Sequence, residues 1–115
     1  WCENIVNVVV PDSVKSIGYE AFKGCEKLLE VTLGNSVSSI GEGAFSMCDV
    51  LTTINIPDSV TTIGKGAFYE CYNLKDLVLG NSVTSIINHV FYNELMIPQD
   101  YFRIKNLNFA LYRLI

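Results

Sequence analysis

The chain has 115 residues, half of them hydrophobic, and a formal net charge of −4. This length suits one domain, and the acidic balance argues against a nucleic-acid-binding surface, which needs a basic face. The longest apolar run, Ile5 to Val10, is interrupted by Asn7 and falls far short of the roughly 18 residues of a membrane span. We therefore expect neither nucleic-acid binding nor membrane insertion by this segment.

A 23-residue repeat organises most of the chain. Each unit begins with a cysteine, holds an isoleucine near its middle and carries a phenylalanine towards its end. The three columns are Cys2, Cys25, Cys48 and Cys71; Ile17, Ile40, Ile63 and Ile86; and Phe22, Phe45, Phe68 and Phe91. We number the units repeats 1 to 4, over residues 2–24, 25–47, 48–70 and 71–93. A fixed period of this length predicts an array in which each unit stacks on the next.

Each unit contains two extended stretches separated by a turn. In the first stretch the outer residues are apolar and face inward while the middle one faces out, which is the period of two typical of a strand. These first stretches are Val8–Val10, Val31–Leu33, Ile54–Ile56 and Leu77–Leu79. Pro or Gly, then Asp or Asn, then Ser follow, and these residues favour a turn. A Val-x-x-Ile stretch comes next, and a short Ala-Phe segment, for which we expect a single helical turn, ends the unit.

Residues 94–115 depart from the repeat. Glu94 stands at the cysteine position, and Asp100 stands where a buried Val or Ile belongs. Terminal units of an array are atypical because they close an open core, so we predict a degenerate C-terminal cap over residues 94–115. The apolar side chains with roughly helical spacing are Ile97, Tyr101, Ile104 and Leu107. This spacing favours a short helix, whereas residues 109–115 fit an extended chain equally well.

Stacking of like residues on like predicts parallel strands about 4.8 Å apart. Four units then make a sheet roughly 15–20 Å across and bury apolar columns that no single unit could bury alone. The N-terminal unit has no visible cap beside Trp1. Its open apolar end suggests end-to-end packing against another unit or another copy.

Repeat 3 carries the motif that resembles a known family. It reads Ile56-Pro57-Asp58-Ser59-Val60-Thr61-Thr62-Ile63-Gly64-Lys65-Gly66-Ala67-Phe68. This pattern is similar to the BspA-like, or treponemal-type, leucine-rich repeat, and the resemblance covers residues 2–93. The sequence departs from the family pattern at Gly34 and Gly80, which replace Pro, and in repeat 4 from Ile87 onward. The tail, residues 94–115, lies outside the resemblance.

The resemblance implies a fold class, a location and a kind of function. The fold would be an α/β or mainly-β solenoid: a right-handed stack of leucine-rich-repeat coils with parallel strands on one face, short helical turns between them and a C-terminal cap. The location would be the cell surface, or the protein would be secreted. Several members of this family act in adhesion to host matrix proteins or to other cells.

The four cysteines leave two alternatives open. Stacked units bring like Cα atoms to about 5 Å, which lies inside the range for disulfides. Cysteine is also one of the most buried residues and packs as a small hydrophobe. Because every cysteine occupies a repeated core position, we favour a column of buried free thiols. A linear column does not converge tetrahedrally, so we expect no zinc site.

No residue pattern supports catalysis or a cofactor. His89 is the only histidine, and no nucleophile is predicted beside it for a Ser-His or Cys-His arrangement. The glycines around Glu42 and Lys65 recur once per unit and lack the Gly-Lys-Ser/Thr of a phosphate loop, so they indicate turns. The column Asp12, Asn35, Asp58 and Asn81 has only two carboxylates, and we interpret it as an exposed turn rather than a calcium ladder. We therefore expect no enzyme, cofactor or metal.

The remaining candidate is the outward surface of the first strands. In solenoids such a face is the usual binding surface, although ordinary solvated strand residues would look the same. The candidate protein-binding residues are Asn7, Val9, Glu30, Thr32, Thr53, Asn55, Asp76 and Val78. The preferred hypothesis is a non-enzymatic protein-recognition module of a surface or secreted protein, plausibly in adhesion. The alternative is a structural spacer or fragment of a longer array that has no ligand of its own.

Overall fold

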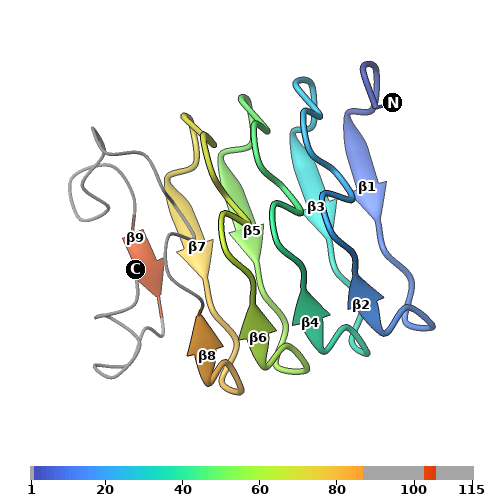
Figure 1. Ribbon diagram of the computed structural model, residues 1–115, viewed down its shortest axis with the longest axis vertical. Helices are drawn as coiled ribbons and strands as arrows, with labels where there is room; N and C mark the ends of the chain where they lie inside the picture. The colour runs from blue at the N-terminus through green and yellow to red at the C-terminus, as the bar shows by residue number, and fades with distance from the viewer. Residues whose placement is uncertain (1, 87–102, 106–115) are drawn as a thin grey trace.

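The computed structural model describes residues 2–86 and 103–105, which form nine short strands and no helix. Figure 1 shows the strands side by side along the stack. Their bounds are β1 (Asn7–Val9), β2 (Ser16–Ile17), β3 (Glu30–Thr32), β4 (Ser39–Ile40), β5 (Thr53–Asn55), β6 (Thr62–Ile63), β7 (Asp76–Val78), β8 (Ser85–Ile86) and β9 (Arg103–Lys105). The fold is therefore of the leucine-rich-repeat type, with short parallel strands.

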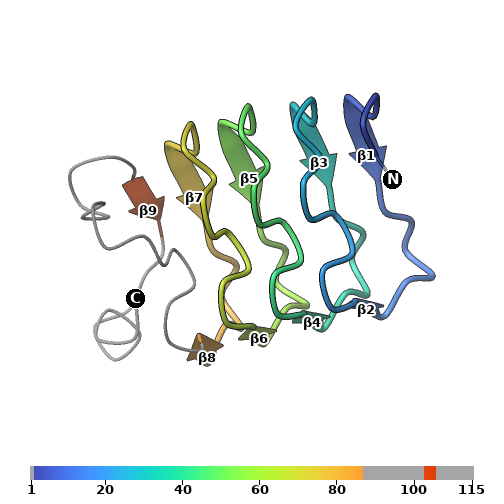
Figure 2. The ribbon, with the colours of Figure 1, turned by 45° about the horizontal axis from the view of Figure 1, so that its top comes forward.

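The first strand of each repeat contributes to one side of the stack. β1 pairs with β3, and β5 pairs with β7, which in turn pairs with β9; all are parallel. In Figure 2 these five strands follow one another along one edge. Val8 lies opposite Val31, and Ile54 opposite Leu77, so partners are 23 residues apart. Each observed strand begins one residue earlier than the predicted stretch.

The second stretch of each repeat forms a continuous sheet. Its order is β2-β4-β6-β8, with all neighbours parallel and again 23 residues apart in register. The stretch that the sequence predicts after the turn is therefore present. Only its last two residues join the ladder, and within them Ile17, Ile40 and Ile63 are buried.

The expected helical turn at the Ala-Phe segment was wrong. The N–H of Ala21 donates to the Gly18 carbonyl, three residues back, at 3.3 Å, whereas the N–H groups of Glu20 and Phe22 cross to repeat 2 and donate to Glu42 and Ala44 at 2.9 and 2.7 Å. A helix needs every N–H to reach the carbonyl four residues back. Alternate groups are committed to the neighbouring repeat instead, so the segment is a series of β-turns.

Left-handed backbone also interrupts any helix in this segment. Glu20, Gly43 and Gly66 share one column and have φ values of 51°, 66° and 62°. A single residue in this conformation breaks a right-handed helix. Glycine adopts it without steric cost at two of the three positions.

The interior is built from the apolar columns. Its fully buried members include Leu28, Leu51 and Leu74 beside the cysteines, and Phe45 and Phe68 at the turns. The Phe22 and Phe45 rings are 5.3 Å apart and 11° from parallel, and those of Phe45 and Phe68 are 5.8 Å apart and 5° from parallel. Aromatic pairs at such distances contribute about 0.5–1.5 kcal/mol beyond their buried area. The phenylalanine column is therefore a continuous stack through three repeats.

The predicted helix in the tail was also wrong where the chain is described. Arg103–Lys105 is a strand, β9, and Ile104 pairs with Leu77 in the sheet. The spacing of Ile104 from its apolar neighbours fits a helix, but its backbone pairs with β7 instead. The other residues of that helix, and most of the cap at 94–115, lie outside the described residues. The unit boundaries and the cap stay predictions.

Two glycines allow close approaches between repeats on the strand side of the stack. A Cβ on Gly34 would lie 2.6 Å from the Pro11 carbonyl oxygen, and one on Gly80 would lie 2.5 Å from that of Pro57. These close approaches join repeats 1 and 2, and repeats 3 and 4. Between repeats 2 and 3, β3 and β5 are neighbours but are not paired, so the expectation that the first strands of all four units form one sheet was wrong at this boundary. Pro57 follows β5 and has no N–H with which to extend a ladder back to repeat 2.

Candidate protein-binding face

The eight sequence-predicted residues lie on four neighbouring strands. Each of β1, β3, β5 and β7 contributes its first and third residue. They fall in two rows: Asn7, Glu30, Thr53 and Asp76 in the first, and Val9, Thr32, Asn55 and Val78 in the second. In-register pairing aligns each row within β1–β3 and within β5–β7. Because alternate residues of a strand point to opposite sides, both rows lie on the side away from the core. We call these eight residues the strand face.

Burial along each strand alternates as the sequence predicts. Ile54 is 1% exposed, whereas its neighbours Thr53 and Asn55 are exposed. Six of the eight residues are exposed, and Asp76 and Val78 are half-buried. Val9 stands out as an apolar side chain with 74% of its surface exposed. The strand face is thus mainly polar, with one bare hydrophobic residue at its N-terminal edge.

The strand face is divided between repeats 2 and 3. Because β3 and β5 are not paired, the rows are held by hydrogen bonds only within β1–β3 and within β5–β7–β9.

The last strand, β9, pairs in register with β7 and so extends both rows by one residue that the sequence analysis did not include. Arg103 is aligned with Asp76, and Lys105 with Val78. The acidic positions Glu30 and Asp76 are therefore followed by basic positions in β9.

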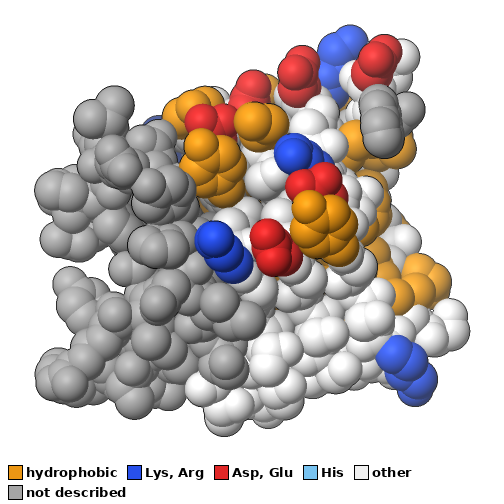
Figure 3. Space-filling model, viewed as in Figure 1, with side chains coloured by type: hydrophobic (Ala, Val, Ile, Leu, Met, Phe, Trp, Pro, Cys, Tyr) orange, Lys and Arg blue, Asp and Glu red, His pale blue; other side chains and the backbone are white. Residues whose placement is uncertain are grey.

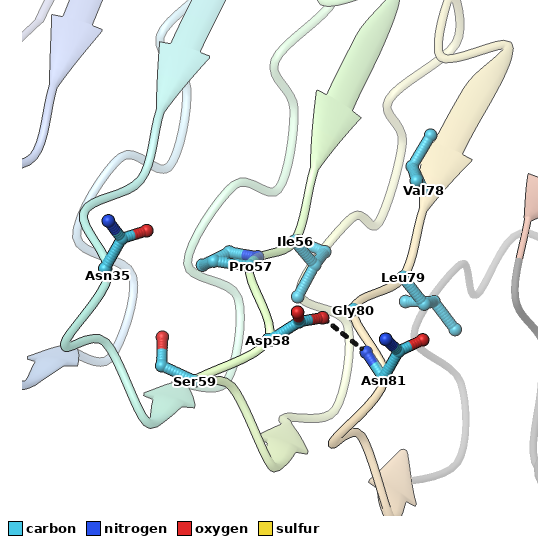
Figure 4. A pocket seen from close by; sticks show the side chains of 9 residues that line it. All are labelled: Asn35, Ile56, Pro57, Asp58, Ser59, Val78, Leu79, Gly80 and Asn81. Atoms are coloured by element: carbon cyan, nitrogen blue, oxygen red, sulfur yellow. Dashed lines mark hydrogen bonds between the residues drawn. The ribbon is translucent and has the colours of Figure 1, made fainter.

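A hollow of about 500 Å³ opens at the corner after the strand face. Figure 4 shows that its lining side chains come from repeats 2, 3 and 4, with Asp58 beside Asn81. The Asp58 carboxylate accepts a hydrogen bond from the Asn81 N–H at 2.8 Å, and Asp12 accepts one from the Asn35 N–H at the same distance. The two carboxylates therefore tie the turn of repeat 1 to that of repeat 2, and the turn of repeat 3 to that of repeat 4.

The side that carries the β-turns is a second exposed surface. Figure 3 shows acidic, basic and hydrophobic side chains interspersed there, with no single charge sign dominating. Glu20 and Lys23 form an exposed ion pair at 3.1 Å, and Tyr19 is 69% exposed. The Glu20 carboxylate raises the pKa of Tyr19 because it accepts the phenol hydrogen bond and repels the phenolate. The sequence analysis missed these side chains because their columns vary from repeat to repeat.

The cysteine column differs from the predicted row of free thiols. Cys2 and Cys25 form a disulfide with their Cα atoms 5.2 Å apart. Cys48 and Cys71 are free and buried. Register explains the bond, because parallel stacking holds like Cα atoms within the disulfide range. The free-thiol prediction was therefore wrong for Cys2 and Cys25, whereas Cys48 and Cys71 are free in this structure.

The described residues contain no other constellation of reactive groups. Among them, no three His, Cys, Asp or Glu side chains lie close enough together to hold a metal ion. His89 lies outside the described residues, as does Trp1 beside the open N-terminal end. Across residues 2–86 and 103–105, no helix has the length and hydrophobicity that crossing a membrane requires.

Three solved structures to which this chain is similar are bacterial leucine-rich repeat proteins. A leucine-rich repeat protein of T. pallidum is 31% identical with a TM-score of 0.78, and the match covers 89% of this chain and 56% of that one. A leucine-rich cell surface protein from Faecalibacterium prausnitzii is 28% identical with a TM-score of 0.84, covering 99% and 29%. A leucine-rich repeat protein from Bacteroides ovatus is 27% identical with a TM-score of 0.78, covering 93% and 31%. The chain thus spans between about a third and just over half of these relatives.

The family match agrees with the structural relatives. No curated protein matches the chain. The model of the BspA type leucine rich repeat region, in six copies, matches residues 1–111. This match reaches beyond residue 93, where the resemblance seen in the sequence ended, and it includes β9. The chain therefore belongs to the BspA-type leucine-rich repeat family.

Proposed function

We propose that this chain is a non-enzymatic protein-recognition module that binds another protein through the strand face. The observation that carries the proposal is the alignment of eight side chains, six of them exposed, in two rows on neighbouring strands. Within each group of paired strands, rows of this kind present mainly polar side chains at the spacing of neighbouring strands. Concave faces of stacked repeats are the usual binding surfaces of such proteins. In this proposal the repeats form a right-handed solenoid closed by the C-terminal cap.

The size of the strand face limits the affinity of this chain. Strands of three residues are about 10 Å long, and four of them span about 20 Å, so the flat area is about 200 Å². A standard interface buries about 800 Å² on each partner. A partner must therefore also contact flanking turns or further repeats. We expect this chain alone to bind weakly, and a longer array to bind more tightly.

A surface or secreted location is part of the proposal. The disulfide between Cys2 and Cys25 supports it, because such bonds persist in oxidising environments outside the cytosol. The name of the Faecalibacterium prausnitzii relative, a cell surface protein, points the same way. An adhesive role towards other cells or matrix proteins would suit this location.

Binding to immobilised extracellular matrix proteins, measured by surface plasmon resonance, tests the proposal. The variant Thr32→Arg/Asn55→Arg places two bulky cations on the strand face. The control Thr61→Arg/Thr84→Arg adds the same charge at exposed positions, also 23 residues apart, beside the second sheet. We expect the first variant to lose binding and the control to retain it. Equal binding by wild type and both variants would exclude the strand face as the contact surface.

A second function, that of a structural spacer, has one observation in its favour. The solved relatives are longer than this chain, which covers only 29–56% of each. In a longer array these repeats could hold other domains apart and bind nothing. Replacing repeats 2 and 3 with two units of unrelated strand-face sequence distinguishes the two functions. A spacer would keep the activity of the whole protein, and a recognition module would lose it.

A further inference from the structure

The strand side of the stack is organised in pairs of repeats. Within repeats 1 and 2, β1 pairs with β3, and Asp12 accepts the N–H of Asn35. Within repeats 3 and 4, β5 pairs with β7, and Asp58 accepts the N–H of Asn81. The close approaches of Gly34 to Pro11 and of Gly80 to Pro57 follow the same division. On the strand side, the strand pairing, the hydrogen bond of the turn and the close approach of the adjacent glycine therefore repeat together with a period of two units.

The boundary between the pairs falls between repeats 2 and 3. There β3 and β5 are not paired. The second sheet does not share this division, because β4 pairs with β6 across the same boundary. The turn segments also continue across it, since the N–H of Phe45 donates to the Ala67 carbonyl at 2.8 Å. The alternation is thus a property of the strand side, where the cysteine column also begins each repeat.

The cysteines follow the same pairing. Cys2 and Cys25 are bonded across the first pair of repeats. Cys48 and Cys71 occupy the same positions in the second pair, and both are buried and free. Each thiol donates to a carbonyl of an earlier phenylalanine, Cys48 to Phe22 at 3.3 Å and Cys71 to Phe45 at 3.0 Å, so the two side chains are placed in the same way in successive repeats. Two like residues one repeat apart, in repeats whose first strands pair in register, reproduce the arrangement that is already bonded in repeats 1 and 2.

We propose that Cys48 and Cys71 are the site of a second disulfide, which covalently closes the second pair of repeats as the first disulfide closes the first pair. The reaction is an exchange with a small-molecule disulfide such as oxidised glutathione. The Cys48 thiolate attacks one sulfur of the reagent and releases one thiol molecule. The Cys71 sulfur then attacks the Cys48 sulfur and releases the second, so that two S–H bonds are lost, one S–S bond forms and the reagent is reduced to two thiols.

The electrostatics of the pair favour Cys48 as the first nucleophile. Its pKa is lowered, chiefly because the Cys71 thiol can donate a hydrogen bond to the Cys48 thiolate. The pKa of Cys71 is raised well above its ordinary value, first by the same interaction and then by burial. The thiolate is the attacking species in exchange. Because both side chains are buried in the folded chain, this preference applies when a local opening admits the reagent to the otherwise intact pair.

The competing bond would join Cys25 to Cys48. These residues are also one repeat apart, so sequence spacing alone does not separate the two possibilities. The Cys25–Cys48 bond would cross the boundary at which β3 and β5 are unpaired. It would also require reduction of the existing disulfide of Cys25. The two-repeat period therefore assigns the partner of Cys48 to Cys71.

Peptide mapping reads the connectivity directly, because trypsin separates all four cysteines. Cleavage after lysine places them on peptides 1–15, 24–27, 28–65 and 66–75. The full chain is refolded in a buffer of reduced and oxidised glutathione and unfolded at acidic pH with N-ethylmaleimide, which blocks free thiols and stops exchange. After digestion, mass spectrometry identifies linked peptides and blocked cysteines.

The expected result is two linked pairs, 1–15 with 24–27 and 28–65 with 66–75. A link between 24–27 and 28–65, or complete blocking of both Cys48 and Cys71, would overturn the proposal. The variant Cys2→Ala/Cys25→Ala provides a second measurement, since only the second pair can then form. If that variant does not fold, the wild-type map still decides the question. Cys71→Ser is the matched control, in which Cys48 must be recovered blocked.

Discussion

Gly34 lies against the backbone of Pro11 with no room for a side chain, because a Cβ at position 34 would lie 2.6 Å from the Pro11 carbonyl oxygen. The neighbouring atoms belong to the backbone of another repeat and cannot move without shifting it. Overpacking of this kind typically costs about 1–3 kcal/mol. We therefore expect Gly34→Ala to lower the free energy of unfolding by about that amount, as measured by urea denaturation.

Gly18 provides the matched control for this prediction. A Cβ at position 18 would meet no atom within 4 Å. Replacing a glycine by alanine in a compatible conformation stabilises by about 0.4–1 kcal/mol, because it restricts the unfolded chain. Gly18→Ala should therefore be neutral or stabilising. Equal destabilisation by both variants would mean that the close approach to Pro11 is not the cause.

The hydrogen bond from the Asn81 N–H to Asp58, at 2.8 Å, should contribute to the joining of repeats 3 and 4. Asp58→Ala removes the acceptor and leaves the N–H to water. A net loss of about 1 kcal/mol is typical for one hydrogen bond. Asp58→Asn keeps a side-chain oxygen at the same position and should recover most of the loss. Thermal denaturation of the three proteins measures the effect, and identical melting temperatures would refute it.

Phe45 is fully buried between two stacked rings. Phe45→Ala leaves a cavity and removes both ring contacts, and such changes cost about 3–5 kcal/mol. Phe22 lies at the end of the same stack and is only half-buried, so Phe22→Ala should cost less. Chemical denaturation compares the two variants. A cost below about 1 kcal/mol for Phe45→Ala would contradict the central place of this column in the core.

The reduced Cys48–Cys71 pair should titrate asymmetrically. Because Cys71 is the main cause of the lowered pKa of Cys48, Cys71→Ala should raise the pKa of Cys48. Ultraviolet absorbance of the thiolate, followed against pH, measures this change. An unchanged or lower pKa of Cys48 in the variant would show that the hydrogen bond between the thiols does not control it.

The same pair makes stability depend on pH. Cys71 retains its proton in the folded state above its ordinary pKa of 9.0. Its contribution to the free energy of unfolding is therefore full below pH 9.0 and is lost as the pH rises through the folded pKa. Urea denaturation of the reduced protein, below and above that value, should show this loss in wild type and not in Cys71→Ala. Parallel pH profiles would contradict the raised pKa.

The sequence by itself determined the repeat, the two extended stretches of each unit and the inward columns, but not the break between β3 and β5. Residues such as Ile54 and Phe45 recur every 23 positions, and stacking buries a recurring apolar residue against its own equivalents. The eight residues of the strand face follow from the same period-two pattern. Sequence periodicity is sufficient for these features because each depends only on the alignment of one unit with the next.

Only the tertiary structure decided the features that depend on how two repeats touch. Gly34 and Gly80 looked like departures from a proline column, whereas in the stack they allow close approach to Pro11 and Pro57. The helical turn at the Ala-Phe segment gave way to β-turns because alternate N–H groups bond to the neighbouring repeat. The cysteines look equivalent in the sequence, yet Cys2 is bonded to Cys25 and Cys48 is not. A column of identical residues does not encode which neighbours pair, because the pairing depends on backbone contacts between successive repeats.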